Sequence, residues 1–238
     1  MVSTVFHFLD ACRMFGIAQA LHLASRWAIR REFLVVQRDL RDPLPVLPAG
    51  DAFRWTHLTE TDIPRVQALN PSLYEAEIRR RVGEGQDCLL CWLGDTLVHY
   101  TWRAMRPAYL PYLGKTIWPL AGDVFVVASF THPAFRRRGI HTWSINRTAR
   151  EARESGLSRR LSMVPWWNTP SIRALRKNGC TVAGRIGYWN AGVRRYYFAA
   201  GEVHLNHAGV LVRPLPGQGI ADPGRQSVSP SRAKVVDR

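Results

Sequence analysis

A basic segment that contains one glycine is the part of the sequence whose residue types could bind a phosphate group. It runs from Thr131 to His141, between a predicted strand and a predicted helix. The N-terminus of a helix offers free N–H groups and a positive dipole end, which suit a pyrophosphate. Gly139 would let the backbone approach the phosphate closely, and residues 136–138, all arginine, would add positive charge. By itself such a turn is common, and its usual meaning is a solvated surface turn.

A second polar pattern occupies the next junction between a strand and a helix. The strand is expected over Arg160–Val164 and the helix over Thr169–Lys177, with Asn168 just before the helix. The Asn168 side chain can cap this helix by accepting a hydrogen bond from a backbone N–H, a role that needs no further function. A second role for Asn168, contact with a ligand, stays open.

Together, the two segments resemble the sequence patterns of the GNAT superfamily of acyl-CoA N-acyltransferases. The first is similar to V-x-P-x-[YF]-[QR]-x-x-G-x-[GA], with Thr131 at the valine position, and the second to N-x-x-[AS]-x-x-x-Y-x-K-x-G-F. The other matching residues are Pro133, Phe135, Arg136 and Gly139 in the first pattern, and Asn168, Ser171, Lys177 and Gly179 in the second. The resemblance covers roughly residues 53–200. Three positions depart from it: His141 replaces glycine or alanine, Leu175 replaces tyrosine and Cys180 replaces phenylalanine.

The resemblance implies an α/β fold of the GNAT type, with a mixed, mostly antiparallel central sheet flanked by helices. The residue patterns independently predict the order strand, two helices, three strands, helix, strand, helix and two strands. Four segments are expected: an N-terminal helix and strand extension (1–42), a proline-containing linker (43–52), the acyltransferase domain (53–213) and a disordered tail rich in proline and glycine (214–238).

The activity that the resemblance implies is transfer of an acetyl group from acetyl-CoA to an amine, by direct attack in a ternary complex. Acetyl-CoA is the expected cosubstrate, and the expected acceptor is a small-molecule amine such as an amino sugar. Backbone N–H groups of Phe130 or Thr131 would stabilise the oxyanion. The expected contacts to acetyl-CoA are Phe130, Thr131, Arg136, Arg137, Arg138, Gly139, Ile140, His141, Asn168 and Ser171.

Two residues are candidates for proton transfer. Asp123 begins the strand expected over residues 123–132 and is the candidate base; alternation along that strand puts it on one face with Ser129. Tyr188 is the candidate acid, because Leu175 has no proton to give to the departing thiolate. The alternatives are a turn-capping role for Asp123 and a half-buried strand position for Tyr188. A thiolate can also leave unaided near neutral pH, since thiols titrate near ~8.5.

The composition leaves other classes of function to weigh. The 238 residues carry a formal net charge of +15, and 30 of the 33 basic residues are arginine. We interpret this ratio mainly as codon bias in a GC-rich bacterial genome, while the positive sign would suit CoA, nucleic acid or an anionic membrane. The basic residues are scattered and not interleaved with aromatic residues, which argues against nucleic acid. The alternatives are a CoA-binding GNAT-like module without catalysis, and a nucleic-acid or ribosome-associated protein.

No metal is expected. Cys88 and Cys91 lie on a predicted strand that sends them to opposite faces, and His204 and His207 have no evident carboxylate or cysteine partner. The cysteines show no disulfide pattern, so a reducing cytoplasm is the expected location.

The N-terminal segment 5–29 has apolar residues at helical spacing but no run of 18 apolar residues, so a spanning helix is not expected. Two interpretations remain open. The helix would either pack on the domain, which we favour, or lie on a membrane surface as a peripheral contact.

Overall fold

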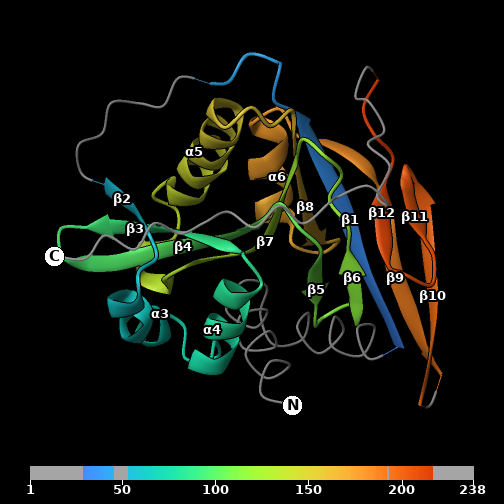
Figure 1. Cartoon of the computed structure of the whole chain (residues 1–238), viewed down its shortest axis with the longest axis horizontal. Coiled ribbons are helices and arrows are strands. Elements are labelled where there is room, and N and C mark those ends of the chain that lie inside the picture. Colours follow the sequence, from blue (N-terminus) through green and yellow to red (C-terminus); the bar gives the residue numbers. More distant parts are fainter. Residues whose placement is uncertain (1–28, 46–52, 192, 217–238) are drawn as a thin grey trace, which may run out of the picture.

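The computed structural model describes residues 29–45, 53–191 and 193–216, and in that part of the chain an eight-stranded sheet forms the centre of the molecule (Figure 1). Its strand order is β10-β9-β1-β8-β7-β4-β3-β2, and only the pair of β7 and β8 is parallel. The strands are β1 (Arg30–Asp39), β2 (Phe53–His57), β3 (Asp87–Leu93), β4 (Thr96–Ala104), β7 (Asp123–Thr131), β8 (Arg159–Pro165), β9 (Thr181–Ala191) and β10 (Arg194–Gly201). The predicted mixed, mostly antiparallel sheet is confirmed.

Helices cover both faces of this sheet. On one face, which we call the α5 face, lie α5 (Ile140–Glu154) and α6 (Thr169–Lys177); on the other, the α3 face, lie α3 (Ile63–Leu69) and α4 (Glu75–Gly83) (Figure 1). The apolar spacing explains these contacts, because α5 buries Ile145, Ala149 and Ala152 along one stripe. The short 3-10 turns are η1 (Glu60–Asp62) and η2 (Pro133–Phe135).

Strand β1 lies inside the sheet, between β8 and β9. It is buried on both faces: Val35 joins the core on the α3 face, and Val36 joins a cluster beneath α6 on the α5 face. A strand that is apolar on both sides is typical of an interior position in a sheet covered by helices. Residues 30–39, which we expected in an N-terminal extension, therefore complete the main sheet.

A β-bulge in β7 changes which side chains face each layer of helices. Strands β4 and β7 pair in antiparallel fashion, with Trp102 opposite Ala128 and Arg103 opposite Val126. Val127 is therefore an extra residue without a partner in β4, which defines the bulge. Val127 packs in the core on the α3 face. The Ser129 hydroxyl instead contacts the hydroxyl of Thr101, which in turn contacts Ser144 on α5. The prediction that Asp123 and Ser129 share a face is wrong, because the bulge inserts one residue between them.

A second, four-stranded sheet packs against the main core on the α3 face, and the sequence patterns did not predict it. Its order is β11-β12-β6-β5, with strands β5 (Ala108–Leu110), β6 (Lys115–Ile117), β11 (Val203–Leu205) and β12 (Val210–Val212). Each strand has three residues, too few for alternation to distinguish a strand from a loop.

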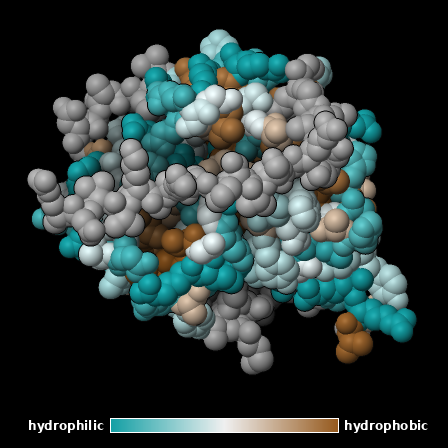
Figure 2. All heavy atoms as spheres, in the orientation of Figure 1, coloured by the Kyte–Doolittle hydropathy of each residue, from teal (hydrophilic) through white to brown (hydrophobic). Residues whose placement is uncertain are grey.

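Helix α4 begins at Glu75 with Tyr74 at its N-cap, and no side chain caps it. Several of the expected segments lie outside the part of the chain that the structure describes. Almost all of the expected N-terminal helix, most of the linker and residues 217–238 lie outside the described residues. Among the helices that the structure describes, none is long and apolar enough to cross a membrane. The described surface visible in Figure 2 is mostly hydrophilic, with small apolar patches.

Candidate active site

The two parallel strands at the middle of the sheet separate before they end. β7 and β8 pair only from Asp123 and Arg159 to Val126 and Ser162, although each strand continues beyond that point. We call residues 127–131 of β7 and 163–165 of β8 the strand fork. β7 keeps β4 as its partner there, and β8 keeps β1. Ser129 is exposed despite its central position in the sheet, which indicates that the fork leaves room beside β7.

The register shows which backbone groups of β7 point into the fork. The N–H of His132 donates to the carbonyl of Val98 at 2.9 Å, so these two residues form a hydrogen-bonded antiparallel pair. Such pairs alternate along a ladder, and Phe130 therefore directs its N–H and C=O at β4. Ser129 and Thr131 direct theirs away from β4, into the fork. Of the two predicted oxyanion donors, Thr131 faces the fork and Phe130 does not.

The predicted phosphate loop leads from the end of β7 into α5. Two of its residues adopt the left-handed region, Arg137 with φ 67° and Gly139 with φ 78°. Left-handed backbone at a turn gathers successive N–H groups on one side, which forms an anion-binding concavity. Gly139 is the N-cap of α5, and no side chain caps the helix. A Cβ at Gly139 would meet no heavy atom within 4 Å, so the space before the helix is open.

The three arginines of this loop differ in their surroundings. Arg136 donates from Nε to the carbonyl of Thr131 at 3.3 Å, and its guanidinium lies 5.9 Å from the Phe130 ring. Arg138 lies 5.2 Å from the Phe135 ring. Arg137 and Arg138 are exposed, and no carboxylate of the described residues forms an ion pair with either. Their positive charge is therefore available to a ligand at the loop.

The side chain of His141 turns into the protein beneath α5. Its Nε2 is buried without a hydrogen-bond partner, and its ring lies 6.2 Å from the ring of His99. Burial, together with the nearby charge of Arg160, lowers the pKa of His141 to about 4, so the imidazole is neutral near pH 7. A contact of His141 with a phosphate would therefore come from its backbone N–H, not from a charged ring.

Asn168 and Ser171 lie across the fork from the phosphate loop. Because β7 and β8 are parallel, the loop after β7 and the start of α6 after β8 meet at one edge of the sheet. The side-chain oxygen of Asn168 accepts a hydrogen bond from the backbone N–H of Ser171 at 3.3 Å, which is the predicted N-cap. The cap uses only the oxygen of this amide, which leaves its N–H groups for a ligand.

Asp123 and Tyr188 lie elsewhere. Asp123 is at the first residue of β7, at the end opposite to the fork, and Arg159 donates to both of its carboxylate oxygens at 2.8 and 2.7 Å. Tyr188 is buried on β9, two strands away from β8, and its hydroxyl donates to the carbonyl of Tyr112 at 3.3 Å. The structure brings neither side chain together with the phosphate loop.

A buried polar network at the fork was not predicted. His99 on β4 is fully buried, with Nδ1 2.7 Å from the Thr131 hydroxyl and Nε2 2.8 Å from the Thr101 hydroxyl. The Thr101 hydroxyl also lies 3.0 Å from that of Ser129 and 2.7 Å from that of Ser144 on α5. The alternation of His99 and Thr101 on one strand was readable from the sequence, but their meeting with β7 depends on the bulge.

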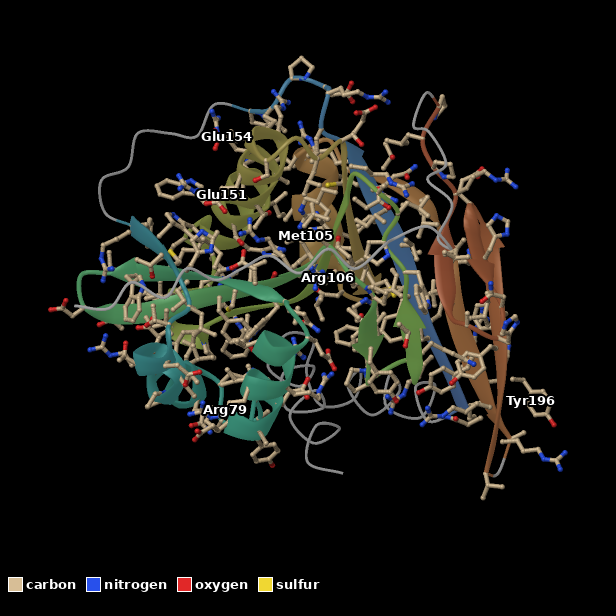
Figure 3. All side chains as sticks on the ribbon, in the orientation of Figure 1. Arg79, Met105, Arg106, Glu151, Glu154 and Tyr196 are labelled. Carbon is tan, nitrogen blue, oxygen red and sulfur yellow. The ribbon has the colours of Figure 1, made fainter. Side chains whose placement is uncertain are left out.

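A cavity of about 420 Å³ lies at the opposite end of α5 and does not belong to this site. Its lining includes Met105, Glu151 and Glu154, which lie toward the upper part of the view in Figure 3. Arg103 pairs there with Glu151 and with Asp87. Arg147 also pairs with Glu151, so both arginines of the lining are paired with carboxylates.

The described residues also contain no group of three His, Cys, Asp or Glu side chains that could hold a metal ion. Cys88 and Cys91 lie on opposite faces of the sheet, one in the core on the α3 face and the other in a cluster with Ile140 of α5. The predicted separation of these two cysteines is confirmed.

No family model matches the sequence, and no curated protein matches it. The structure is similar to that of a GNAT-family acetyltransferase from Novosphingobium aromaticivorans, with a TM-score of 0.50 and 17% sequence identity over 66% of this chain. The chain covers 62% of the length of that structure. The chain therefore has the fold of the GNAT acetyltransferases.

Two further structures show weaker similarity. A GCN5-related N-acetyltransferase from Kribbella flavida has a TM-score of 0.49 and 13% identity, covering 75% of this chain and 65% of that one. AAC(6')-Iy in complex with the bisubstrate analogue CoA-S-monomethyl-acetylneamine has a TM-score of 0.41 and 17% identity, covering 53% of this chain and 89% of that one.

Proposed function

We propose that this chain is an acetyl-CoA-dependent N-acetyltransferase that acts on a small-molecule amine in a ternary complex. The observation that carries the proposal is the strand fork beside an uncapped helix: β7 and β8 separate after Val126 and Ser162, and β7 leads through Gly139 into α5. An extended ligand can then place a pyrophosphate at the helix N-terminus and an arm between the strands. CoA has this shape and this chemistry.

The residues around the loop fit a pyrophosphate. The backbone N–H groups of Gly139, Ile140 and His141 would donate to its oxygens at the uncapped end of α5. Arg137 and Arg138 would balance its negative charge. The free N–H groups of the Asn168 amide, and the hydroxyl of Ser171, would contact the pantetheine arm from the other side of the fork.

In the proposed reaction, the neutral amine attacks the carbonyl carbon of the thioester and a C–N bond forms. The carbonyl oxygen becomes an oxyanion, and the N–H of Ser129 or Thr131, directed into the fork, donates a hydrogen bond to it. The C–S bond then breaks, the CoA thiolate leaves, and the nitrogen loses a proton to water. Asp123 and Tyr188 have no direct part, because both hold other groups at a distance from the fork.

The acceptor would approach from the α3 face, because α5 covers the opposite face. Tyr100 and Phe130 stack there with ring centroids 5.9 Å apart, and the Asn70 amide donates to the Tyr100 hydroxyl at 2.7 Å. Aromatic rings beside polar groups suit a polar amine, and an amino sugar is one such amine.

One observation favours a second candidate, a module that binds CoA without catalysis. Leu175 lies at the position where the GNAT pattern has tyrosine, and it is buried in the cluster between α6 and the sheet. It can neither donate a proton nor reach a ligand. This candidate shares the CoA site with the enzyme and differs from it only in turnover.

Two measurements test the proposal in sequence. Acetyl-CoA in millimolar excess should raise the melting temperature, because a ligand that binds only the native state stabilises it. Release of free thiol from acetyl-CoA should then be followed with a panel of amines that includes amino sugars. Thiol release that depends on an amine supports the enzyme, and stabilisation without thiol release supports the binding module. A folded protein that acetyl-CoA does not stabilise would falsify both.

A further inference from the structure

The buried network of His99 ends at a hydroxyl that reaches the strand fork. Ser129 is exposed at the fork, and its hydroxyl lies 3.0 Å from that of Thr101. Thr101 is buried and connects Ser129 to Nε2 of His99 at 2.8 Å. The other ring nitrogen of His99 lies 2.7 Å from the hydroxyl of Thr131, which returns the chain of contacts to β7. One exposed hydroxyl is thus coupled to a fully enclosed imidazole.

The imidazole of His99 is neutral in this network. Its burial, with a smaller contribution from His141, lowers the pKa of His99 well below its ordinary value of 6.5. A neutral imidazole has one N–H donor and one acceptor nitrogen. His99 can therefore accept from one hydroxyl and donate to the other, but it cannot donate to both.

The donors and acceptors of the network allow only certain arrangements of its hydrogen bonds. The Thr101 hydroxyl has one proton and two lone pairs, and it contacts three polar atoms, on His99, Ser129 and Ser144. If Thr101 donates to Ser129, it accepts from His99 and Ser144, and His99 accepts from Thr131. Every contact is then satisfied, and the proton of the Ser129 hydroxyl is left to point into the fork. In the opposite arrangement, Ser129 donates to Thr101, Thr101 donates to His99 and His99 donates to Thr131. Every contact is again satisfied, but a lone pair of the Ser129 hydroxyl then points into the fork.

Within the proposed acetyl transfer, on which this inference rests, we propose that the Ser129 hydroxyl donates a hydrogen bond to the departing sulfur of CoA. Thr101 and His99 are positioning residues that hold the hydroxyl in the donating direction. The C–S bond breaks with its electron pair on sulfur, the thiolate accepts the hydrogen bond from Ser129, and it takes its proton later from water. The negative charge on the sulfur favours the arrangement in which Thr101 donates to Ser129, because the proton of the Ser129 hydroxyl then points toward the sulfur.

This assignment fills a gap left by the other candidate groups. Leu175 has no hydroxyl and is buried in a separate cluster, and the Tyr188 hydroxyl donates to a backbone carbonyl. Ser129 differs from both because it lies on the forked part of β7 itself. A donor directed at developing charge lowers the barrier more than it strengthens binding of the uncharged thioester.

The titration of bound CoA tests the assignment without an acceptor amine. The ultraviolet absorbance of the thiolate is followed against pH for CoA bound to the wild-type protein and to Ser129→Ala, with desulfo-CoA as the blank for protein groups. We expect the pKa of the bound thiol to be lower in the wild type by about one unit. Ser129→Thr, which keeps a hydroxyl, should restore the lower value. An equal thiol pKa in the wild type and Ser129→Ala overturns the inference.

Turnover supplies the second readout. Ser129→Ala and the nearly isosteric Thr101→Val should each lower kcat by about 10- to 1,000-fold, with little change in the KM for acetyl-CoA. Thr96→Val, at an exposed position of the same strand, is the control and should leave kcat unchanged. If Thr101→Val does not fold, Ser129→Ala alone decides, because its side chain is exposed.

The outcomes separate this inference from the proposed function. A wild-type protein that transfers acetyl groups, with Ser129→Ala within threefold of it, keeps the function and overturns the inference. Loss of stabilisation by acetyl-CoA in Ser129→Ala also overturns it, because Ser129 would then act in binding. A wild-type protein that acetyl-CoA does not stabilise overturns the function and this inference with it.

Discussion

Arg159 holds both carboxylate oxygens of Asp123, and neither side chain is exposed to solvent. Arg159 also donates to the backbone carbonyls of Val212, the last residue of β12, and of Arg213, which follows it. The pair therefore joins the first residues of β7 and β8 to the end of β12. A buried ion pair of this kind is costly to break from one side, because the remaining charge stays in the interior without its partner.

We predict that Asp123→Asn lowers the free energy of unfolding by about 3–5 kcal/mol. Urea denaturation measures this change, and Asp95→Asn, in an exposed turn, is the matched control that should change it little. At a temperature where the variant is still folded, its kcat should stay within a few-fold of the wild type. A variant of normal stability that has lost turnover would instead identify Asp123 as the base.

The phosphate loop gives a second prediction. Gly139 and Gly156 lie at opposite ends of α5, each with φ 78° and with no heavy atom within 4 Å of a Cβ placed there. Glutamate at either position therefore meets the same backbone strain and the same open space. Gly139→Glu should abolish stabilisation by acetyl-CoA, since its charge would face the pyrophosphate, while Gly156→Glu should retain it. Equal thermal shifts in the two variants would show that CoA binds elsewhere.

The sequence predicted this loop and missed the network behind it for one physical reason. The glycine at the N-terminus of α5 and the cap at Asn168 depend on residues within one turn of themselves. The extra residue Val127 becomes visible only when β7 is paired with β4, some 25 residues away in the chain. Without the bulge, alternation would have placed Ser129 in the core on the α3 face, out of reach of Thr101 and His99.

Elsewhere in the fold, elements with local sequence signals were also predicted, and features that depend on distant strands were not. Helix α6 was predicted at its observed bounds, because its apolar spacing and its Asn168 cap are local signals. The position of β1 between β8 and β9 could not be read from its apolar residues, which indicate that the strand is buried but not which strands are its neighbours. The four strands of the small sheet have no local signal of sufficient length.

His141 gives a prediction about pH. Its pKa is about 4 in the folded protein, against an ordinary value of 6.5 for a solvated histidine, so below pH 6.5 the unfolded chain binds more protons. The free energy of unfolding should therefore fall as the pH is lowered from 6.5 toward 4, by roughly 3 kcal/mol from this group. His99, whose pKa is also lowered, adds a loss of the same sign.

The variant His141→Gln isolates the contribution of His141, because it cannot titrate. Urea denaturation at about pH 7 and about pH 5 should show a smaller loss of stability in the variant than in the wild type. The difference between the two proteins is the measured quantity, since His99 titrates in both. An equal loss in both would mean that the His141 ring is not buried in solution.

The interior position of β1 gives the last prediction. A fragment that begins at residue 43 keeps the whole segment that resembles the GNAT patterns, but it lacks the strand that both β8 and β9 use as a neighbour. Two unpaired strand edges and the apolar side chains that face β1 would then be left in water. We expect this fragment to show no cooperative unfolding transition.

Because truncation also removes residues 1–28, Val35→Asp in the full chain tests β1 alone. Val35 is 0% exposed, so an unpaired carboxylate there should lower the free energy of unfolding by about 4 kcal/mol or more. Ile29→Asp, at a position that is 58% exposed, should change it by less than about 0.5 kcal/mol. A stable, CoA-binding fragment that starts at residue 43 would show that β1 is an appendage and that β8 and β9 can pair without it.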